Sequence, residues 1–267
     1  MKRFLRPALA LLATLLAVPA AADVPVGELP ATAEPVAYRI DLEVDPKKAS
    51  FAGTTEIDLL LKEGAETLYL HGLGLSVTAA EALTGRMAPN AITYREVHPT
   101  GVAELRFARP LPPGKHTLRF RYTAPFQTAT SGLYKAEVAG KSYAWTQFQA
   151  IDARRVFPGF DEPRHKTPFT VSLTVPKGNR AFANAPEASA TPLPDGRMKH
   201  QFASFGPSPT YLLAMAVGPF DVVEGVIPPN AIRKRPLAFR AIATQGQAKR
   251  LAFTMRETPK ILPILED

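Results

Sequence analysis

Cysteine is missing from this sequence of 267 residues, so disulfides and thiol nucleophiles are excluded from its chemistry. Histidine is also scarce, with five residues: His71, His98, His116, His165 and His200. No two are four residues apart and none precedes a glutamate, so the H-E-x-x-H pattern of zinc-binding helices is absent. We therefore predict no catalytic residue and no metal ligand in this chain, and we interpret His116, His165 and His200 as solvent-facing.

Other motifs that mark enzymes or nucleic-acid-binding proteins are absent as well. There is no G-x-S-x-G elbow and no Walker A loop, and Gly72-Leu73-Gly74 lacks the third glycine of a dinucleotide fingerprint. The formal charge is +8, but the basic residues are scattered among acidic ones and form no run interleaved with aromatics. We expect a mildly basic surface and no nucleic-acid partner.

The first 22 residues have the pattern of a signal peptide. A basic region with three Lys or Arg residues comes first, then an apolar region over residues 8–18, then Ala20-Ala21-Ala22 as a cleavage site. The apolar run is too short to span a bilayer, so we expect cleavage, a secreted or periplasmic protein and no membrane anchor. Cleavage would lower the formal charge from +8 to +5 and leave 245 residues (267 − 22).

Residues 23–243 read as one large β domain. Residues 23–37 are rich in proline and predict an extended arm. Apolar and polar residues then alternate over residues 38–44 and 51–61, which predicts an antiparallel hairpin. Thr210 to Val217 is nearly all apolar and predicts a strand buried on both faces. Further strands are expected at 67–73, 91–97, 102–107, 115–123, 143–148, 169–175, 180–185, 198–204 and 237–243.

The spacing of these strands favours an all-β fold with a sandwich-type or strongly curved sheet. The turn Leu111-Pro112-Pro113-Gly114 is expected to close one of the hairpins. Residues 244–267 change to a helical pattern. Thr244-x-x-Gln247 resembles a capping box, and Pro259 and Pro263 are expected to interrupt the helix.

The densest local chemistry lies between Thr146 and Phe169. It reads T-Q-F-Q-A-I-D-A-R-R, then V-F-P-G-F-D-E-P, then a return to strand-like alternation. Asp161 and Glu162 could form a catalytic carboxylate pair, but neighbouring side chains on an extended chain point in opposite directions. Arg154 and Arg155 could bind a peptide carboxylate, but they have acidic neighbours in the sequence. We favour a structural turn held by ion pairs.

Three motifs in order resemble the M1 family of zinc aminopeptidases. Residues 132–134 match the family's G-L-Y, and the central run after them resembles T-Q-F-E-x-x-x-A-R-x-x-F-P-C-x-D-E-P. Further along the chain, residues 208–220 resemble S-x-T-Y-L-L-A-F-A-V-G-x-F. The resemblance implies the saddle-shaped N-terminal β domain of these enzymes. It also implies that the helix over 244–267 opens a truncated catalytic domain, and that the zinc ligands and the G-x-M-E-N motif belong to chain not present here.

The resemblance also implies a substrate-binding role for Gln147 and Gln149. These positions match a Gln-x-Glu or Gln-x-Gln pair at the edge of the zinc cleft, where the second residue holds the α-amino group of the peptide substrate. Many members have Glu in place of Gln149, which gives a charge-assisted bond to an ammonium. The neutral amide can accept and donate. The alternative is that both glutamines only satisfy nearby backbone groups.

Two functions follow as hypotheses. The first is the substrate-rim domain of an exported zinc aminopeptidase, inactive alone, with the peptide N-terminus and the missing catalytic domain as partners. The second is a free-standing periplasmic β module that binds peptides or another protein without catalysis.

Overall fold

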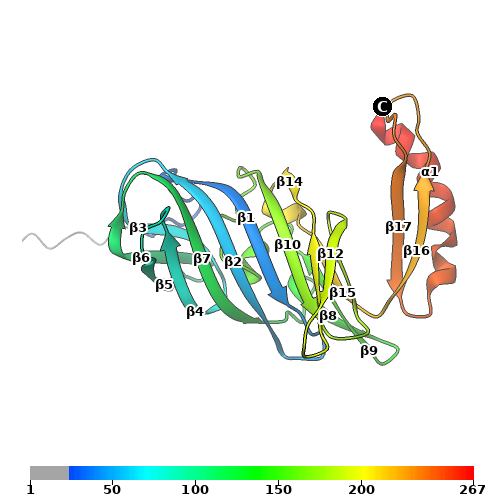
Figure 1. The fold of residues 1–267 in the computed structure, drawn as a ribbon, viewed down its shortest axis with the longest axis horizontal. Helices are drawn as coiled ribbons and strands as arrows, with labels where there is room; N and C mark the ends of the chain where they lie inside the picture. Colours follow the sequence, from blue (N-terminus) through cyan, green and yellow to red (C-terminus); the bar gives the residue numbers. More distant parts are fainter. Residues whose placement is uncertain (1–23) are drawn as a thin grey trace, which may run out of the picture.

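The computed structural model describes residues 24–267, so the predicted signal peptide lies outside the described residues. Strands make up most of this part of the chain, and one α-helix follows them at the C-terminal end (Figure 1). The first nine strands are β1 (Ala33–Glu43), β2 (Ser50–Leu61), β3 (Ala65–His71), β4 (Ser76–Leu83), β5 (Asn90–His98), β6 (Val102–Leu111), β7 (Gly114–Pro125), β8 (Gly132–Val138) and β9 (Lys141–Gln147). The others are β10 (Thr167–Val175), β11 (Arg180–Ala183), β12 (Glu187–Pro192), β13 (Met198–Phe202), β14 (Phe205–Ser208), β15 (Met215–Gly218), β16 (Phe220–Ile227) and β17 (Leu237–Thr244).

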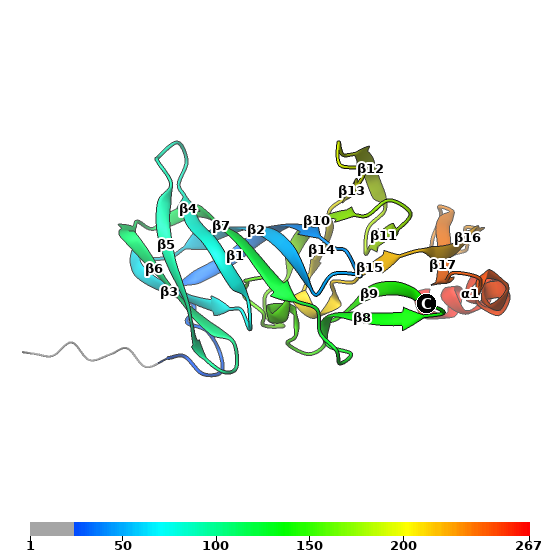
Figure 2. The ribbon, with the colours of Figure 1, turned by 90° about the horizontal axis from the view of Figure 1, so that it is seen from below.

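The largest unit is an 11-stranded mixed sheet in the order β12-β13-β10-β1-β2-β7-β4-β5-β6-β3, with β14 also paired to β10. Its strands lie side by side in a curved layer (Figures 1 and 2). The pair β1–β10 is parallel, with Tyr38 opposite Phe169, whereas β1 and β2 form the predicted antiparallel pair. The all-β prediction with a large mixed sheet and a short C-terminal helix is confirmed.

Alternation along the central strands builds the core. In β1, Tyr38, Ile40 and Leu42 are each at most 1% exposed, while the residues between them face outward. Tyr38 stacks on Phe169 of the parallel neighbour, with ring centroids 5.0 Å apart. The same apolar cluster includes Phe148, Phe157 and other buried residues of the central run, so that run is anchored to the main core.

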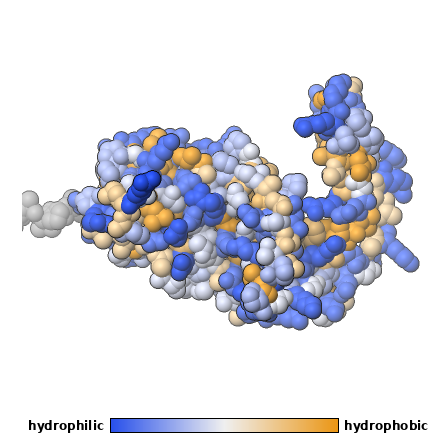
Figure 3. Space-filling model, viewed as in Figure 1, coloured by the Kyte–Doolittle hydropathy of each residue, from blue (hydrophilic) through white to orange (hydrophobic). Residues whose placement is uncertain are grey.

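Two smaller sheets complete the described chain. The four-stranded sheet β11-β15-β9-β8 carries the aromatic strand β9, and the two-stranded sheet β16–β17 packs with the C-terminal helix α1 (Ala252–Glu266). In Figures 1 and 2 this last unit projects from one end of the molecule, and Figure 3 shows apolar surface along it. Within residues 24–267, no helix is long and apolar enough to cross a membrane.

Several local predictions were wrong. The turn over residues 111–114 joins β6 to β7, but β6 pairs with β5 and β3, and β7 pairs with β2 and β4, so no hairpin forms there. Residues 210–217 are not one strand, because the 3-10 helix η2 (Thr210–Leu212) precedes β15. The arm over residues 23–37 is shorter than predicted, because β1 already begins at Ala33. Strands β4, β8, β12, β14 and β16 were not predicted.

The C-terminal segment also differs from its prediction. A 3-10 helix, η3 (Ala248–Leu251), leads into α1, and Gln247 at its start makes no side-chain capping bond. Helix α1 runs through Pro259 and Pro263 without a break. Strand β17 ends at Thr244, pairs with β16 and contacts η3, which leads into α1. The predicted domain boundary after residue 243 stays a prediction.

Candidate functional site

The stretch from Phe148 to Lys166, called the signature loop below, leaves β9 and returns to the main sheet at β10. It contains the 3-10 helix η1 (Ala153–Arg155). Backbone bonds join Gly159 to His71 of β3 in both directions, at 2.8 and 2.9 Å. The Phe160 N–H donates to the Tyr38 hydroxyl at 2.9 Å, and Phe160 is 2% exposed. The segment Phe157-Pro158-Gly159-Phe160 is therefore a packed turn rather than an open ligand site.

Gln147 and Gln149 are exposed on either side of buried Phe148, which is 1% exposed. Gln147 is the last residue of β9 and lies opposite Gly132 of β8, while Gln149 begins the loop. Phe148 packs edge-on against Phe157, with ring centroids 6.1 Å apart. The backbone is thus anchored through Phe148, and both amides face solvent. The Gln149–Ala150 peptide bond is cis.

A buried ion pair fixes the loop from within. Arg154 Nε lies 3.0 Å from Asp161 Oδ2, and the two side chains are 6% and 1% exposed. The Arg154 backbone N–H donates to the same oxygen at 3.2 Å, and its Nη2 donates to the Asp161 carbonyl oxygen at 3.0 Å. Thr210 Oγ1 donates to Asp161 Oδ1 at 2.5 Å, and Arg154 Nη1 donates to the Thr100 carbonyl oxygen at 2.7 Å. The prediction of a structural turn held by ion pairs is confirmed for this residue pair.

The second carboxylate of the turn holds the N-terminal arm, residues 24–32. Glu162 accepts a bond from the Leu29 N–H at 2.7 Å, and Arg164 Nη2 donates to the Leu29 carbonyl oxygen at 2.7 Å. Arg164 and Glu162 pair at 2.7 Å, and Leu29 is 3% exposed. Asp161 and Glu162 therefore have separate structural partners. Arg155 is also structural, because its Nε lies 2.8 Å from Asp152.

The histidines differ from the prediction that three of them face solvent. His116 is 4% exposed, with ring nitrogens 2.8 Å from Thr84 Oγ1 and 2.8 Å from the Pro112 carbonyl oxygen. Both polar partners come from other turns, so the imidazole is buried with its hydrogen bonds made. The His165 side chain is 16% exposed and lies 3.3 Å from Glu162, and burial together with nearby Arg164 lowers its pKa.

His200 is partly buried as well. Its Nδ1 lies 2.7 Å from Glu187, and its Nε2 is buried without a partner among the described residues. The contact with Glu187 could not be predicted from the sequence, because Glu187 lies on the neighbouring strand β12.

The residues present do not fit the zinc ion of the family. Across residues 24–267, no three His, Asp or Glu side chains gather in a way that could hold a metal ion. The two most buried acids, Asp161 and Glu162, are already bound by arginines. We therefore derive no catalytic step through a metal from this chain.

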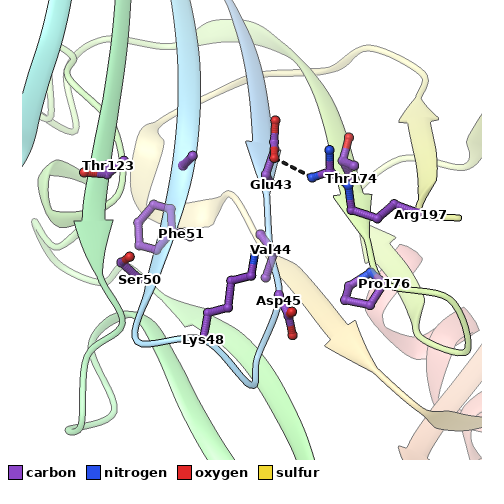
Figure 4. A pocket seen from close by; sticks show the side chains of 11 residues that line it. Glu43, Val44, Asp45, Lys48, Ser50, Phe51, Thr123, Thr174, Pro176 and Arg197 are labelled. Atoms are coloured by element: carbon purple, nitrogen blue, oxygen red, sulfur yellow. Dashed lines mark hydrogen bonds and ion pairs between the residues drawn. The ribbon is translucent and has the colours of Figure 1, made fainter. Parts of the chain in front are cut away.

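The outer face of the main sheet carries paired charges. Arg197, from the turn before β13, has its Nη1 2.5 Å from Glu43 Oε2. Both residues line a cavity of about 180 Å³, together with Lys48 and Phe51 (Figure 4). Lys199 pairs with Asp41 on the same face. Since exposed ion pairs contribute about 0–1 kcal/mol each, we assign them no site role.

The fold is that of a large β domain, and a buried ion pair anchors its signature loop beside the exposed Gln147 and Gln149. A family model for the Peptidase M1 N-terminal domain matches residues 34–212. The chain belongs to the M1 peptidase family.

Three relatives show the range of similarity. The chain is 31% identical over 242 residues to aminopeptidase N of Acetobacter pasteurianus, covering 89% of this chain and 65% of the relative. It is 30% identical over 261 residues to aminopeptidase Ey of Gallus gallus, covering 89% of this chain and 26% of the relative. It is 31% identical over 202 residues to aminopeptidase M1-B of Oryza sativa subsp. japonica, covering 74% of this chain and 23% of the relative. The chain thus spans less than two thirds of the length of each of these relatives.

The sequence did not reveal the roles of Thr210 and His71. Thr210 stands in the matched S-x-T-Y-L-L motif, which could have singled it out, but its bond to Asp161 spans 49 residues. His71 follows an ordinary strand pattern, and no local signal marks its contact with the loop.

Proposed function

We propose that this chain is the substrate-rim domain of an exported M1-type zinc aminopeptidase, and that Gln147 and Gln149 hold the N-terminal end of the peptide substrate. One observation carries the proposal. In a domain of this family, two exposed amides stand at the edge of a loop whose backbone is fixed by a buried ion pair and by Phe148. A rigid support is what a positioning group requires.

The chemistry of the amides sets their roles. The Gln149 carbonyl oxygen accepts a hydrogen bond from the substrate α-ammonium, and its amide N–H donates to a peptide carbonyl. Gln147 binds the same end of the peptide, because it is exposed at the end of β9, two residues before Gln149. Neither side chain can take a proton at neutral pH, so this chain binds and orients substrate. Hydrolysis requires the zinc-binding part of the polypeptide, and the chain alone is inactive.

The test is kinetic and uses the full-length protein. Gln149→Ala removes a hydrogen bond to a charged group, so kcat/KM for peptides should fall by about tenfold to a hundredfold. Gln201→Ala, an exposed glutamine on β13, is the matched control and should leave kcat/KM unchanged. Gln149→Glu should increase the preference for a free α-amine over a blocked one. Equal kcat/KM for Gln149→Ala and parent would remove Gln149 from the site.

Export is the second part of the proposal, and it rests on the pattern of residues 1–22. The exported protein should begin at Asp23. Intact-mass measurement of the protein recovered from the periplasm or medium tests this, and retention of the 22 residues would contradict it.

A further inference from the structure

A cavity of about 580 Å³ lies between the N-terminal arm, the signature loop and β3. Its apolar wall includes Val26, Ile151 and Pro163, and the first two are 59% and 47% exposed. Such volumes are typical of pockets for small ligands, which are mostly apolar with a few placed polar groups. Large apolar side chains left open to solvent on two facing segments mark a surface that gains free energy by being covered.

Four of the five charged residues that line the cavity neutralise one another in pairs. Arg154 is paired with Asp161, and Arg164 is paired with Glu162, so these four residues bring no net charge. Glu28 is 84% exposed and lies 3.3 Å from Arg164, so it is solvated at the rim. An ionic ligand would lose its hydration here without gaining an unpaired counter-charge.

Among the lining side chains that the structure describes, the imidazole of His71 offers an uncharged polar group. The residue lines the cavity and is 2% exposed. Its Nδ1 accepts a bond from the Asp161 N–H at 3.3 Å, so the ring hydrogen is on Nε2. Among residues 24–267, Nε2 has no hydrogen-bond partner.

The His71 imidazole stays neutral at physiological pH. Burial, reinforced by the positive charge of Arg154, lowers its pKa to about 3. The cavity therefore offers apolar walls and one neutral N–H donor.

We propose that this cavity binds an uncharged peptide segment, with one apolar side chain packed between Val26 and Ile151 and a carbonyl oxygen accepting a hydrogen bond from His71 Nε2. An apolar side chain beside a neutral acceptor is the combination that a peptide residue presents. The proposal does not depend on the role of Gln147 and Gln149.

N-acetyl-leucinamide is the probe, because it has an apolar side chain and two uncharged carbonyls. In an NMR titration of the protein, the Ile151 methyl and His71 Nε2 signals should shift with one Kd on the order of 1 mM. Leucinamide, which is cationic, and N-acetyl-leucine, which is anionic, should each bind at least about tenfold more weakly. No saturable shift up to about 20 mM, or equal binding of the charged probes, would overturn the proposal.

Substitutions at three positions locate the site. Ile151→Ala should weaken binding by about fivefold to tenfold, whereas Ile232→Ala, at a residue 50% exposed outside the cavity, should leave the Kd unchanged. His71→Phe removes the donor and should weaken binding by about twofold to tenfold, with partial recovery in His71→Gln. If the His71 variants do not fold, the Ile151 and Ile232 pair decides alone. Equal changes in Kd for Ile151→Ala and Ile232→Ala would contradict the proposal.

Discussion

Asp161→Asn should be among the most destabilising single substitutions in this domain. The carboxylate is 1% exposed and accepts bonds from the Arg154 backbone and guanidinium and from Thr210. Asparagine keeps the shape but leaves the Arg154 charge buried, with 6% exposure and no counter-charge. Removing one partner of a buried pair typically costs about 3–5 kcal/mol, a large share of the stability of an ordinary domain.

Urea unfolding followed by circular dichroism measures this cost, with an unchanged m-value as the check that the transition remains two-state. The control is Asp195→Asn, which breaks an exposed pair with Arg197 at 2.6 Å and should leave the midpoint close to that of the parent. Replacing Arg154 and Asp161 together by Met and Leu should recover much of the loss, because no buried charge then remains. A loss below about 1 kcal/mol for Asp161→Asn would refute the view that this pair holds the loop.

The other predictions concern pH, packing and the arm. Below its ordinary pKa of about 6.5 the unfolded chain protonates at His71, whereas the folded chain does so only near pH 3, so stability falls as pH drops between these values. The free energy of unfolding should fall by at most about 1.4 kcal/mol per pH unit in this range. Urea titrations at several pH values measure this slope, and an equal slope for the parent and a His71→Gln variant would contradict the role of His71. Gly53→Ala places a methyl group 2.5 Å from the Tyr122 ring and should cost about 1–3 kcal/mol in the same assay, whereas a neutral result would show that the ring can move. Glu162→Ala removes the acceptor of the Leu29 N–H, so limited proteolysis should cut the arm faster with the core intact, and equal cleavage rates would argue against this anchor.

Strands with one buried and one solvated face were predictable from sequence. In β1, Tyr38, Ile40 and Leu42 alternate with polar residues because the sheet covers the core on one side only. Strand β12 shows no such pattern, since all six of its residues are exposed. The hairpin prediction for residues 111–114 failed because turn chemistry fixes where a chain reverses, while strand partners depend on contacts distant in sequence.

The candidate site was likewise predictable from the sequence only in part. The positions of Gln147 and Gln149 came from the family resemblance, and their exposure fits a substrate role that is still a prediction. The ion pair of Arg154 with Asp161 was predictable because the partners are seven residues apart. His71 could not be predicted, since its loop partner Asp161 is 90 residues away, and His116 was misjudged because its partner Thr84 is 32 residues away.

The parallel pairing of β1 with β10 has a consequence for biosynthesis. Strand β1 can pair with β2 soon after both are synthesised. Its other partner, β10, which places Phe169 opposite Tyr38, is synthesised much later. A nascent chain that has reached only β7 therefore displays β1 as an open hydrogen-bonding edge, the kind that recruits other chains. A chain that ends in this interval would be an aggregation-prone half-sheet, and a chaperone that masks residues 33–43 until residues 167–175 are available would prevent its aggregation.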